Sequence, residues 1–218
     1  MPTPFIAQES YSISSIDLPL TVLSAGKNPA WDRAAGLTSF SYPWDSGEPP
    51  STMFKALHSK DWIFFQYAVK DDNIQILVNV NDKIEVIGSD RVEIFFRTDD
   101  KLAPYYCLEI DPLGRILDYK AKFHRQFDMT WSWPEGHLIA KAERDHCGYT
   151  VEVAISKESL INLGLLKKNK IEAGIFRANC TTTAGDTDHM KWISWLKPDS
   201  PTPDFHLPSA FGVLLLED

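Results

Sequence analysis

Cysteine is scarce in this sequence, and an excess of positive charge and long apolar runs are missing. The three cysteines, Cys107, Cys147 and Cys180, lie at wide spacings that form neither a disulfide framework nor a zinc motif. The formal net charge is -8, so the basic surface that phosphate binding needs is absent, and we expect no nucleic-acid partner. No stretch reaches the roughly 18 continuous apolar residues of a membrane span, so we expect no membrane partner.

The first thirteen residues also lack two features, a basic start and an apolar core, that together mark a secretory signal. Taken as written, the sequence therefore predicts a cytoplasmic protein, and a secreted one only if the sequence was trimmed. The six histidines fall in no nucleophile motif, which leaves no pattern for a Ser-His-Asp hydrolase.

The stretch 89–122 contains three short alternating runs joined by two turns. Apolar and polar residues alternate in 91–97, 105–111 and 115–122, and a period of two is typical of half-buried strands. We expect one face of this meander to pack in a core. The opposite, polar face is expected to carry Arg91, Glu93, Phe95, Arg97, Tyr105, Cys107, Glu109, Asp111, Asp118, Lys120 and Lys122.

The rest of the chain predicts more short strands and one helix. Strands are expected at 10–23 (an edge segment), 52–58, 62–69, 138–144, 148–155, 171–180, 192–195 and 212–216, with a partial strand in 74–87, while 37–42 alternates only weakly. The helix is expected at 157–163, with Ser156 capping its start and Gly164 at its end. This pattern predicts an all-β fold, two packed antiparallel sheets in an immunoglobulin-like β-sandwich, as a single domain over 1–218.

Six runs together resemble the family 9 carbohydrate-binding modules, and most closely their free-standing, family 9-like branch. They are FKALHSKDWIFFQYAVKDDN, SDRVEIFF, YYCLEIDPLGRILD, GYTVEVAIS, WISW and PDFHLPSAFG. The resemblance extends from about Trp31 to the C-terminus. It implies a jelly-roll-like sandwich, non-catalytic binding of an oligosaccharide or polysaccharide in carbohydrate catabolism, and association with xylanases.

The family's site residues carry over only in part. In the family, two tryptophans enclose a sugar ring, and the matching positions here are Ile87 and Phe205. Glu93 matches the sugar-contacting glutamate of the family. The arginine and asparagine of the next strand appear here as Glu109 and Asp111.

The residues themselves also suggest a sugar site. Pyranose rings offer C–H patches to aromatic faces, and their hydroxyls suit planar bidentate partners. The candidate ligands are the polar residues Glu93, Glu109, Asp111, Arg91, Arg177 and Asn179 and the aromatic residues Phe205, Trp131, Trp133 and Trp195. Trp31, Trp62 and Trp192 are expected in the core, where large rings usually lie.

Two other functions stay open. Glu93 and Glu109 lie on neighbouring strands and could form the carboxylate pair of a glycoside hydrolase, although Arg91 and Arg97 on the same face favour an ion-pair network. A sandwich without ligand, acting as an accessory or interaction domain, is the other alternative.

Metal binding is predicted only weakly. The resemblance implies structural calcium in several members, and turns at 71–73, 99–100 and 186–188 offer the carboxylate oxygens that calcium prefers. No twelve-residue calcium loop is present, so solvated turn charges are the favoured interpretation and no catalytic metal or cofactor is expected.

Overall fold

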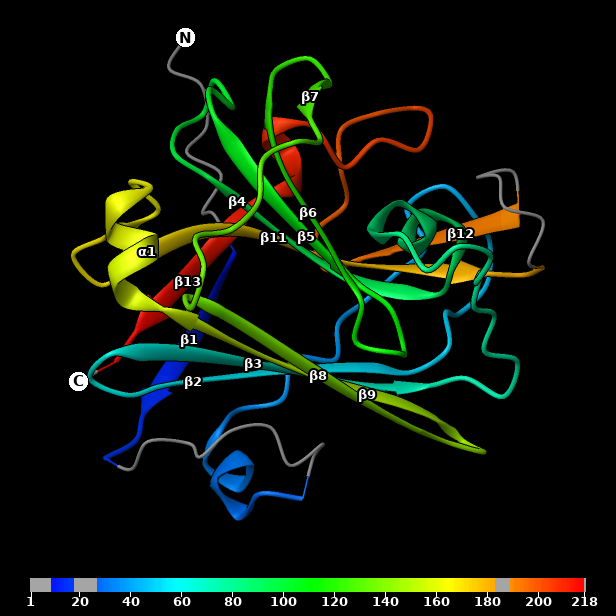
Figure 1. Cartoon of the computed structure of the whole chain (residues 1–218), viewed down its shortest axis with the longest axis horizontal. Coiled ribbons are helices and arrows are strands. Elements are labelled where there is room, and N and C mark those ends of the chain that lie inside the picture. The colour runs from blue at the N-terminus through cyan, green and yellow to red at the C-terminus, as the bar shows by residue number, and fades with distance from the viewer. Residues whose placement is uncertain (1–8, 18–26, 183–188, 218) are drawn as a thin grey trace, which may run out of the picture.

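The computed structural model describes residues 9–17, 27–182 and 189–217, and the all-β prediction is confirmed (Figure 1). The strands are β1 (Ser10–Ser15), β2 (Thr52–His58), β3 (Trp62–Lys70), β4 (Arg91–Arg97), β5 (Tyr105–Ile110), β6 (Ile116–Lys122), β7 (Gln126–Asp128), β8 (Leu138–Asp145), β9 (Gly148–Ser156), β10 (Leu166–Lys167), β11 (Lys170–Cys180), β12 (Met190–Ser194) and β13 (Gly212–Leu216). The helices are α1 (Lys157–Asn162) and the 3₁₀ turns Pro29–Arg33, Lys83–Gly88 and Pro208–Ala210. No helix among these described residues is long and apolar enough to cross a membrane.

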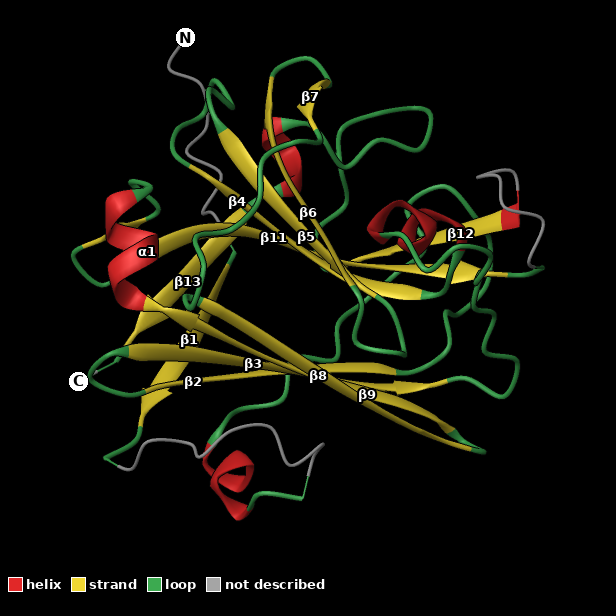
Figure 2. Cartoon of the chain, in the orientation of Figure 1, coloured by secondary structure: helices red, strands yellow, loops and turns green. Residues whose placement is uncertain are grey.

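The strands form two layers that share β1 (Figure 2). One layer has the order β7-β6-β5-β4-β11-β13-β1, and β10 and β12 also pair with β11. The other has the order β1-β2-β3-β9-β8. Residues 10–13 of β1 pair in parallel with β13, and residues 14–15 pair in parallel with β2. The first strand therefore passes from one layer to the other.

The largest core lies between the two layers. Phe65 of β3 packs against Phe96 of β4 with 6.1 Å between ring centroids, and both side chains are fully buried. Ile94 and Val153 belong to the same cluster. Burial of such a side chain stabilises the fold by about 1.5–3 kcal/mol. The apolar residues at alternate positions of β4 thus face the other layer, as their period of two predicts.

A second apolar cluster covers the outer face of the β4-β5-β6 meander. The sequence prediction of which β6 residues lie on this face is wrong. Tyr119 of β6 lies directly opposite Cys107, and Leu117 lies opposite Glu109, so these two residues share the polar face. Asp118 instead lies opposite Leu108 on the face toward the other layer. Alternation separates the two faces of each strand, but the turn between strands decides which faces match.

The partial strand expected in 74–87 and the edge position expected for the first strand are both wrong. Segment 74–87 forms an irregular loop followed by a 3₁₀ turn, and the carboxylate of Glu85 accepts hydrogen bonds from the amides of Asn79, Val80 and Asn81 at 3.0, 2.6 and 3.1 Å. A side chain therefore satisfies the amides that a strand would pair. Segment 37–42 makes only isolated bridges, and β1 is not an edge strand, since it pairs on both sides. The predicted extension of that first strand over 18–23 lies outside the described residues.

The predicted helix is present as α1. The Ser156 hydroxyl accepts a hydrogen bond from the Ser159 amide at 3.1 Å, which caps the first turn as expected.

Candidate functional site

A cavity of about 360 Å³ opens on the outer face of the β4-β5-β6 meander. It is lined by Trp44, Ile87, Arg91, Glu93, Phe95, Glu109, Tyr119, Arg125, Phe127, Met129, Trp192, Pro203, Asp204, Phe205 and His206. The meander supplies the buried charges together with Phe95 and Tyr119, while Phe127 lies on β7 and Trp192 on β12. The loops before β2 and after β12 add Trp44 and Phe205. Strands thus hold the polar floor and part of the wall, and loops complete the wall.

The buried floor of the cavity holds three charged residues, Arg91, Glu93 and Glu109, which we call the floor cluster. Glu93 on β4 lies directly opposite Glu109 on β5. Arg91 Nε donates to Glu109 Oε2 at 2.6 Å and lies 2.9 Å from Glu93 Oε1. The single hydrogen on Nε points to Glu109, so Glu93 Oε1 receives no hydrogen bond although it is buried. Glu109 is better satisfied, since its Oε1 accepts from the Tyr119 hydroxyl at 2.8 Å.

The floor cluster favours a neutral Glu93. Burial and then the neighbouring charge of Glu109 raise the pKa of Glu93 to about 8, although Arg91 acts in the opposite direction. The Glu93 carboxyl is therefore mostly protonated at neutral pH in the cavity as described. Such a group can donate a hydrogen bond when protonated and accept one when ionised.

Aromatic rings form the walls above this floor. Phe205 stacks on Phe176 with 4.0 Å between centroids and 11° between planes. Trp44 lies 5.5 Å from Phe205, and Trp192 meets Phe205 edge-on at 5.6 Å. Both tryptophans are half-buried, so part of each indole stays open to solvent. Phe127, at 39% exposed, extends the apolar wall outward.

The rim carries a second set of polar side chains. Arg125 and His124 both contact the Asp204 carboxylate, at 3.3 and 2.9 Å. His206 stacks on Phe95 at 5.2 Å. Burial, followed by the positive charge of Arg125, lowers the pKa of His206 to about 3, so this imidazole is neutral at physiological pH. The rim thus pairs its acidic and basic side chains locally.

Of the ten residues predicted to bind ligand, four meet at this cavity: Arg91, Glu93, Glu109 and Phe205. Ile87, which was matched to a tryptophan position of the family, also lines the cavity, although its side chain is aliphatic. The three floor residues follow from the alternation of β4 and β5, which sets them on one face.

The other three polar candidates lie elsewhere. Asp111 is fully buried in the β5-β6 turn, where it accepts from the backbone amide of Arg115 at 3.0 Å and pairs with the Arg115 guanidinium. Arg177 is fully buried and pairs with Asp71. Asn179 donates to the same Asp71 carboxylate at 3.3 Å. These contacts hold turns and loops to the sheet.

The three tryptophan candidates pack away from the cavity. The Trp133 indole donates to the Ser159 hydroxyl at 3.0 Å, and Trp131 lies 5.7 Å from the Trp133 ring. Trp195 is 6% exposed and covers Gly212, where an added Cβ would lie 2.5 Å from the indole. All three therefore belong to the packing between the layers or at its margin.

Sequence reasoning missed several cavity residues. Trp192 was expected in the core, but it lines the cavity with Arg91 above its ring at 5.4 Å. Trp44 lies in a proline-rich loop, where an aromatic residue is itself a signal of surface function. Tyr119 was missed because the predicted register of β6 turned it away. The expected core positions of Trp31, 3% exposed, and half-buried Trp62 agree with the structure.

The predicted calcium turns do not form a cage of free oxygens in the described part of the chain. Asp71 accepts from the Asn73 amide and pairs with Arg177, while Asp99 accepts from the Lys101 amide at 2.9 Å. Asp100 pairs with Arg97 at 2.7 Å. Asp186 and Asp188 lie outside the described residues.

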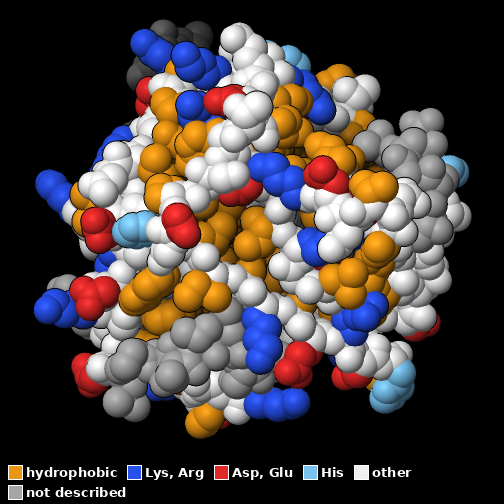
Figure 3. Space-filling model, in the orientation of Figure 1, with side chains coloured by type: hydrophobic (Ala, Val, Ile, Leu, Met, Phe, Trp, Pro, Cys, Tyr) orange, Lys and Arg blue, Asp and Glu red, His pale blue; other side chains and the backbone are white. Residues whose placement is uncertain are grey.

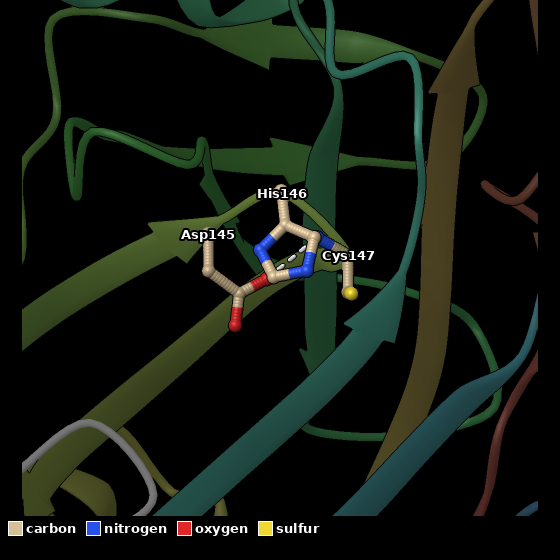
Figure 4. A group of neighbouring side chains, drawn as sticks. All are labelled: Asp145, His146 and Cys147. Atoms are coloured by element: carbon tan, nitrogen blue, oxygen red, sulfur yellow. Dashed lines mark hydrogen bonds between the residues drawn. The ribbon is translucent and has the colours of Figure 1, made fainter.

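One group of described residues brings three metal-type ligand atoms within 4.8 Å of one another: Asp145, His146 and Cys147, in the exposed β8-β9 turn (Figure 4). The Asp145 carboxylate already accepts a hydrogen bond from the Cys147 amide at 2.7 Å. This contact is typical of a tight turn, and it explains why the three side chains lie together.

The surface drawn in Figure 3 mixes apolar, acidic and basic side chains. Among the described residues on that face, basic side chains are interspersed with acidic ones. The described residues on this face therefore form no continuous basic strip.

These features define an all-β protein with a ring-sized cavity on the outer face of one layer, walled by aromatic residues above buried carboxylates. The chain belongs to the family described as carbohydrate family 9 binding domain-like, whose sequence model matches residues 25–218. Membership in this family is thus shown for most of the chain.

Solved structures share the fold at low sequence identity. A candidate carbohydrate-binding protein from Bacteroides uniformis ATCC 8492 superimposes with a TM-score of 0.68 at 18% identity, over 97% of this chain and 100% of that one. A family 9 carbohydrate-binding module from Caldicellulosiruptor kristjanssonii, in complex with glucose, gives 0.60 at 16% identity, over 96% of both chains. Its complex with cellotriose gives 0.60 at 15% identity, over 96% and 94%. No curated protein sequence matches the chain.

Proposed function

We propose that this protein binds carbohydrate without altering it, and that the cavity above the floor cluster is its binding site. The observation that carries the proposal is the combination of the half-buried indoles of Trp44 and Trp192 on the cavity wall with a buried, incompletely hydrogen-bonded carboxyl at Glu93. Sugar rings stack their C–H patches on aromatic faces, and their hydroxyls pair with carboxylates and guanidinium groups. Family membership and structural neighbours that bind glucose and cellotriose support the same function.

The floor cluster argues against a hydrolase. A retaining glycosidase holds its two carboxyl groups about 5–5.5 Å apart with the scissile bond between them. Here Glu93 and Glu109 both contact the Nε of Arg91, so a guanidinium occupies the space that the bond would need. The carboxylates are therefore suited to hold a ligand rather than to cleave it.

The proposal extends to the fold type, the extent of the module and its biological role. We infer a jelly-roll-like β-sandwich that acts as one carbohydrate-binding module over 1–218. Its role would be to assist the breakdown of a plant-type polysaccharide such as xylan beside a separate hydrolase. The layered arrangement that shares β1 and the match over residues 25–218 support the fold and the single module. The resemblance to modules attached to xylanases motivates the proposed role.

A panel of oligosaccharides tests the function. Isothermal titration and tryptophan fluorescence should detect saturable binding of at least one sugar, because Trp44 and Trp192 line the site. Chromatography of the same mixtures should show no shortened product. Release of product would support the hydrolase instead, and absence of binding across the panel would favour the accessory domain without ligand.

A further inference from the structure

The charges of the floor cluster balance only while Glu93 keeps its proton. Arg91 is the basic residue of the floor cluster, and it faces two carboxyl groups, on Glu93 and Glu109. The three residues are 3%, 2% and 5% exposed, so water screens them poorly. At the rim, Arg125 already pairs with Asp204. With both glutamates ionised, the floor would therefore carry one uncompensated negative charge.

Two nitrogens of Arg91, Nε and Nη1, already donate to other acceptors. Its Nε serves Glu109, and its Nη1 donates to the carbonyl oxygens of Ile87 and Ser89 at 2.8 and 3.3 Å. Glu93 Oε1 is left buried without a donor. An unsatisfied buried acceptor costs about 1–3 kcal/mol, and a ligand that supplies a donor recovers this free energy. The floor thus lacks one hydrogen-bond donor, and it would need a further positive charge to hold Glu93 in its ionised form.

The walls suit a cation as well as a sugar ring. The faces of tryptophan and phenylalanine carry partial negative charge and attract ammonium groups within about 6 Å. The cavity already places one cation this way, since the Arg91 guanidinium lies 5.4 Å from the Trp192 ring. Trp44 and Phe205 stand on the same wall. A positive group on the ligand would therefore meet carboxyl groups below and aromatic faces around it.

We propose that this cavity prefers amino sugars, rings that carry a primary ammonium, over the corresponding neutral sugars. The inference rests on the proposed carbohydrate-binding function and names its ligand class. An ammonium supplies three donors to Glu93 and a positive charge that favours the ionised form of its carboxyl, whereas a hydroxyl at the same ring position supplies one donor and no charge. The cavity volume of about 360 Å³ accommodates a single ring.

The test compares two trisaccharides with the same β-1,4 linkage, cellotriose and its fully 2-amino counterpart built from glucosamine. Titration calorimetry at pH 6.5 and low salt should give at least about tenfold tighter binding of the amino trisaccharide, which corresponds to about 1.4 kcal/mol. Equal affinities, or a preference for cellotriose, would overturn the inference and leave the proposed function intact. Binding of neither, nor of any other sugar in the panel, would overturn both.

A third ligand separates charge from size. The N-acetylated trisaccharide keeps the nitrogen but is neutral, so its affinity should lose the advantage of the amino form. If the N-acetylated and amino forms bind equally well, the positive charge has no role and the inference fails. This comparison uses the unaltered protein and does not depend on any variant folding.

Glu93→Gln tests the residue that carries the preference, and Glu135→Gln is the matched control because Glu135 is exposed in the loop before β8. Glu93→Gln should reduce the preference for the amino trisaccharide to within about threefold, since the amide cannot supply the compensating negative charge. Glu135→Gln should keep it. Thermal unfolding of both variants checks that each is folded. A preference unchanged in folded Glu93→Gln would overturn the assignment to Glu93.

Proton release gives an independent readout. An ammonium beside Glu93 lowers the pKa of that carboxyl from about 8, so binding near pH 6.5 should release up to one proton to the buffer. The other titratable or charged groups that face the cavity are Arg91, Glu109, Tyr119, Arg125, Asp204 and His206. Titrations in phosphate and in Tris should differ in apparent enthalpy for the native protein and agree for Glu93→Gln. Identical heats in both buffers for the native protein would contradict a role for Glu93.

Discussion

Two neighbouring strands, β4 and β11, each bury an arginine among carboxyl groups, and the two clusters differ in one respect that bears on function. The floor cluster lies at the cavity, whereas a second group of Arg177, Asp71 and Asp90, which we call the enclosed cluster, lines no cavity described above. Arg177 is fully buried, and Asn179 donates to both Asp71 and Asp90, at 3.3 and 3.4 Å. Composition and burial alone would not separate the two.

Hydrogen bonding separates them. In the enclosed cluster, Asp90 accepts from the backbone amides of Cys180 and Gln75, each at 2.6 Å, and both oxygens of Asp71 are also bonded. In the floor cluster, Glu93 Oε1 receives no hydrogen bond. The carboxylates of the enclosed cluster are thus bonded, and its buried atom without a partner is a donor, Arg177 Nε. The enclosed cluster fastens the loop before β4 to β11, whereas the floor cluster lacks a donor at Glu93 and faces space that a ligand can fill. A buried charge is therefore informative about binding mainly when a donor is missing beside a cavity.

Of the changes to the two clusters, Asp71→Ala should have the largest effect on stability. The change leaves Arg177 buried without its direct partner, and the free energy of unfolding should fall by about 3–5 kcal/mol. Exposed Asp72→Ala is the matched control and should stay within about 0.5 kcal/mol. Urea denaturation measures both. Equal stability of the two variants would show that the enclosed cluster does not hold the fold.

Glu93→Gln should shift the pH dependence of stability by a smaller amount. The folded protein holds the Glu93 proton with a pKa near 8, above the value of about 4.3 in an unfolded chain. The stability from this group is thus fully present below about pH 4 and is lost as the pH rises to about 8. Glu93→Gln should therefore gain a few kcal/mol relative to the native protein between pH 5 and pH 9, as urea denaturation at each pH would measure. A difference that does not change with pH would contradict the raised pKa.

Trp44→Ala should weaken binding more than it weakens the fold. Loss of one stacking face costs about 1–2 kcal/mol of sugar affinity, or roughly five- to thirtyfold, because Trp44 is on the cavity wall. Trp131→Ala is the control, since Trp131 is also half-buried but packs beside Trp133. Affinity by titration calorimetry should fall for Trp44→Ala alone. A loss in both, with equal changes in melting temperature, would assign the effect to stability.

The sequence predicts the sheet content and the charged floor of the site, and the reason lies in the range of the interactions involved. Alternation within β4 and β5 placed Arg91, Glu93 and Glu109 on one face, because side-chain direction in a strand has a period of two. The capped helix α1 was also predicted, because the contact between Ser156 and Ser159 that caps it joins residues close in sequence. Glu85, by contrast, binds the amides of residues 79–81, and no period in the sequence shows that contact.

The parts of the site that the sequence did not predict depend on contacts between distant segments. Trp44 reaches Phe205 across the fold, and Arg177 reaches Asp71, although neither pair is close in sequence. The polar side chains of Arg177 and Asn179 suggested a ligand site as strongly as those of the floor cluster did. Only their contacts with Asp71 show that they hold the loop before β4 instead. Polarity on a strand predicts a demand for partners, but not whether the chain or a ligand supplies them.

The parallel pairing of β1 with β13 has a mechanical consequence. In parallel neighbours, the start of one strand and the end of the other lie at opposite ends of the pair, so tension applied through residues 10 and 216 would slide the strands past each other. Their hydrogen bonds would then be strained simultaneously instead of opening one by one, which raises the force needed for extension. A molecule pulled through these two strands is thereby suited to keep its sheets intact under load.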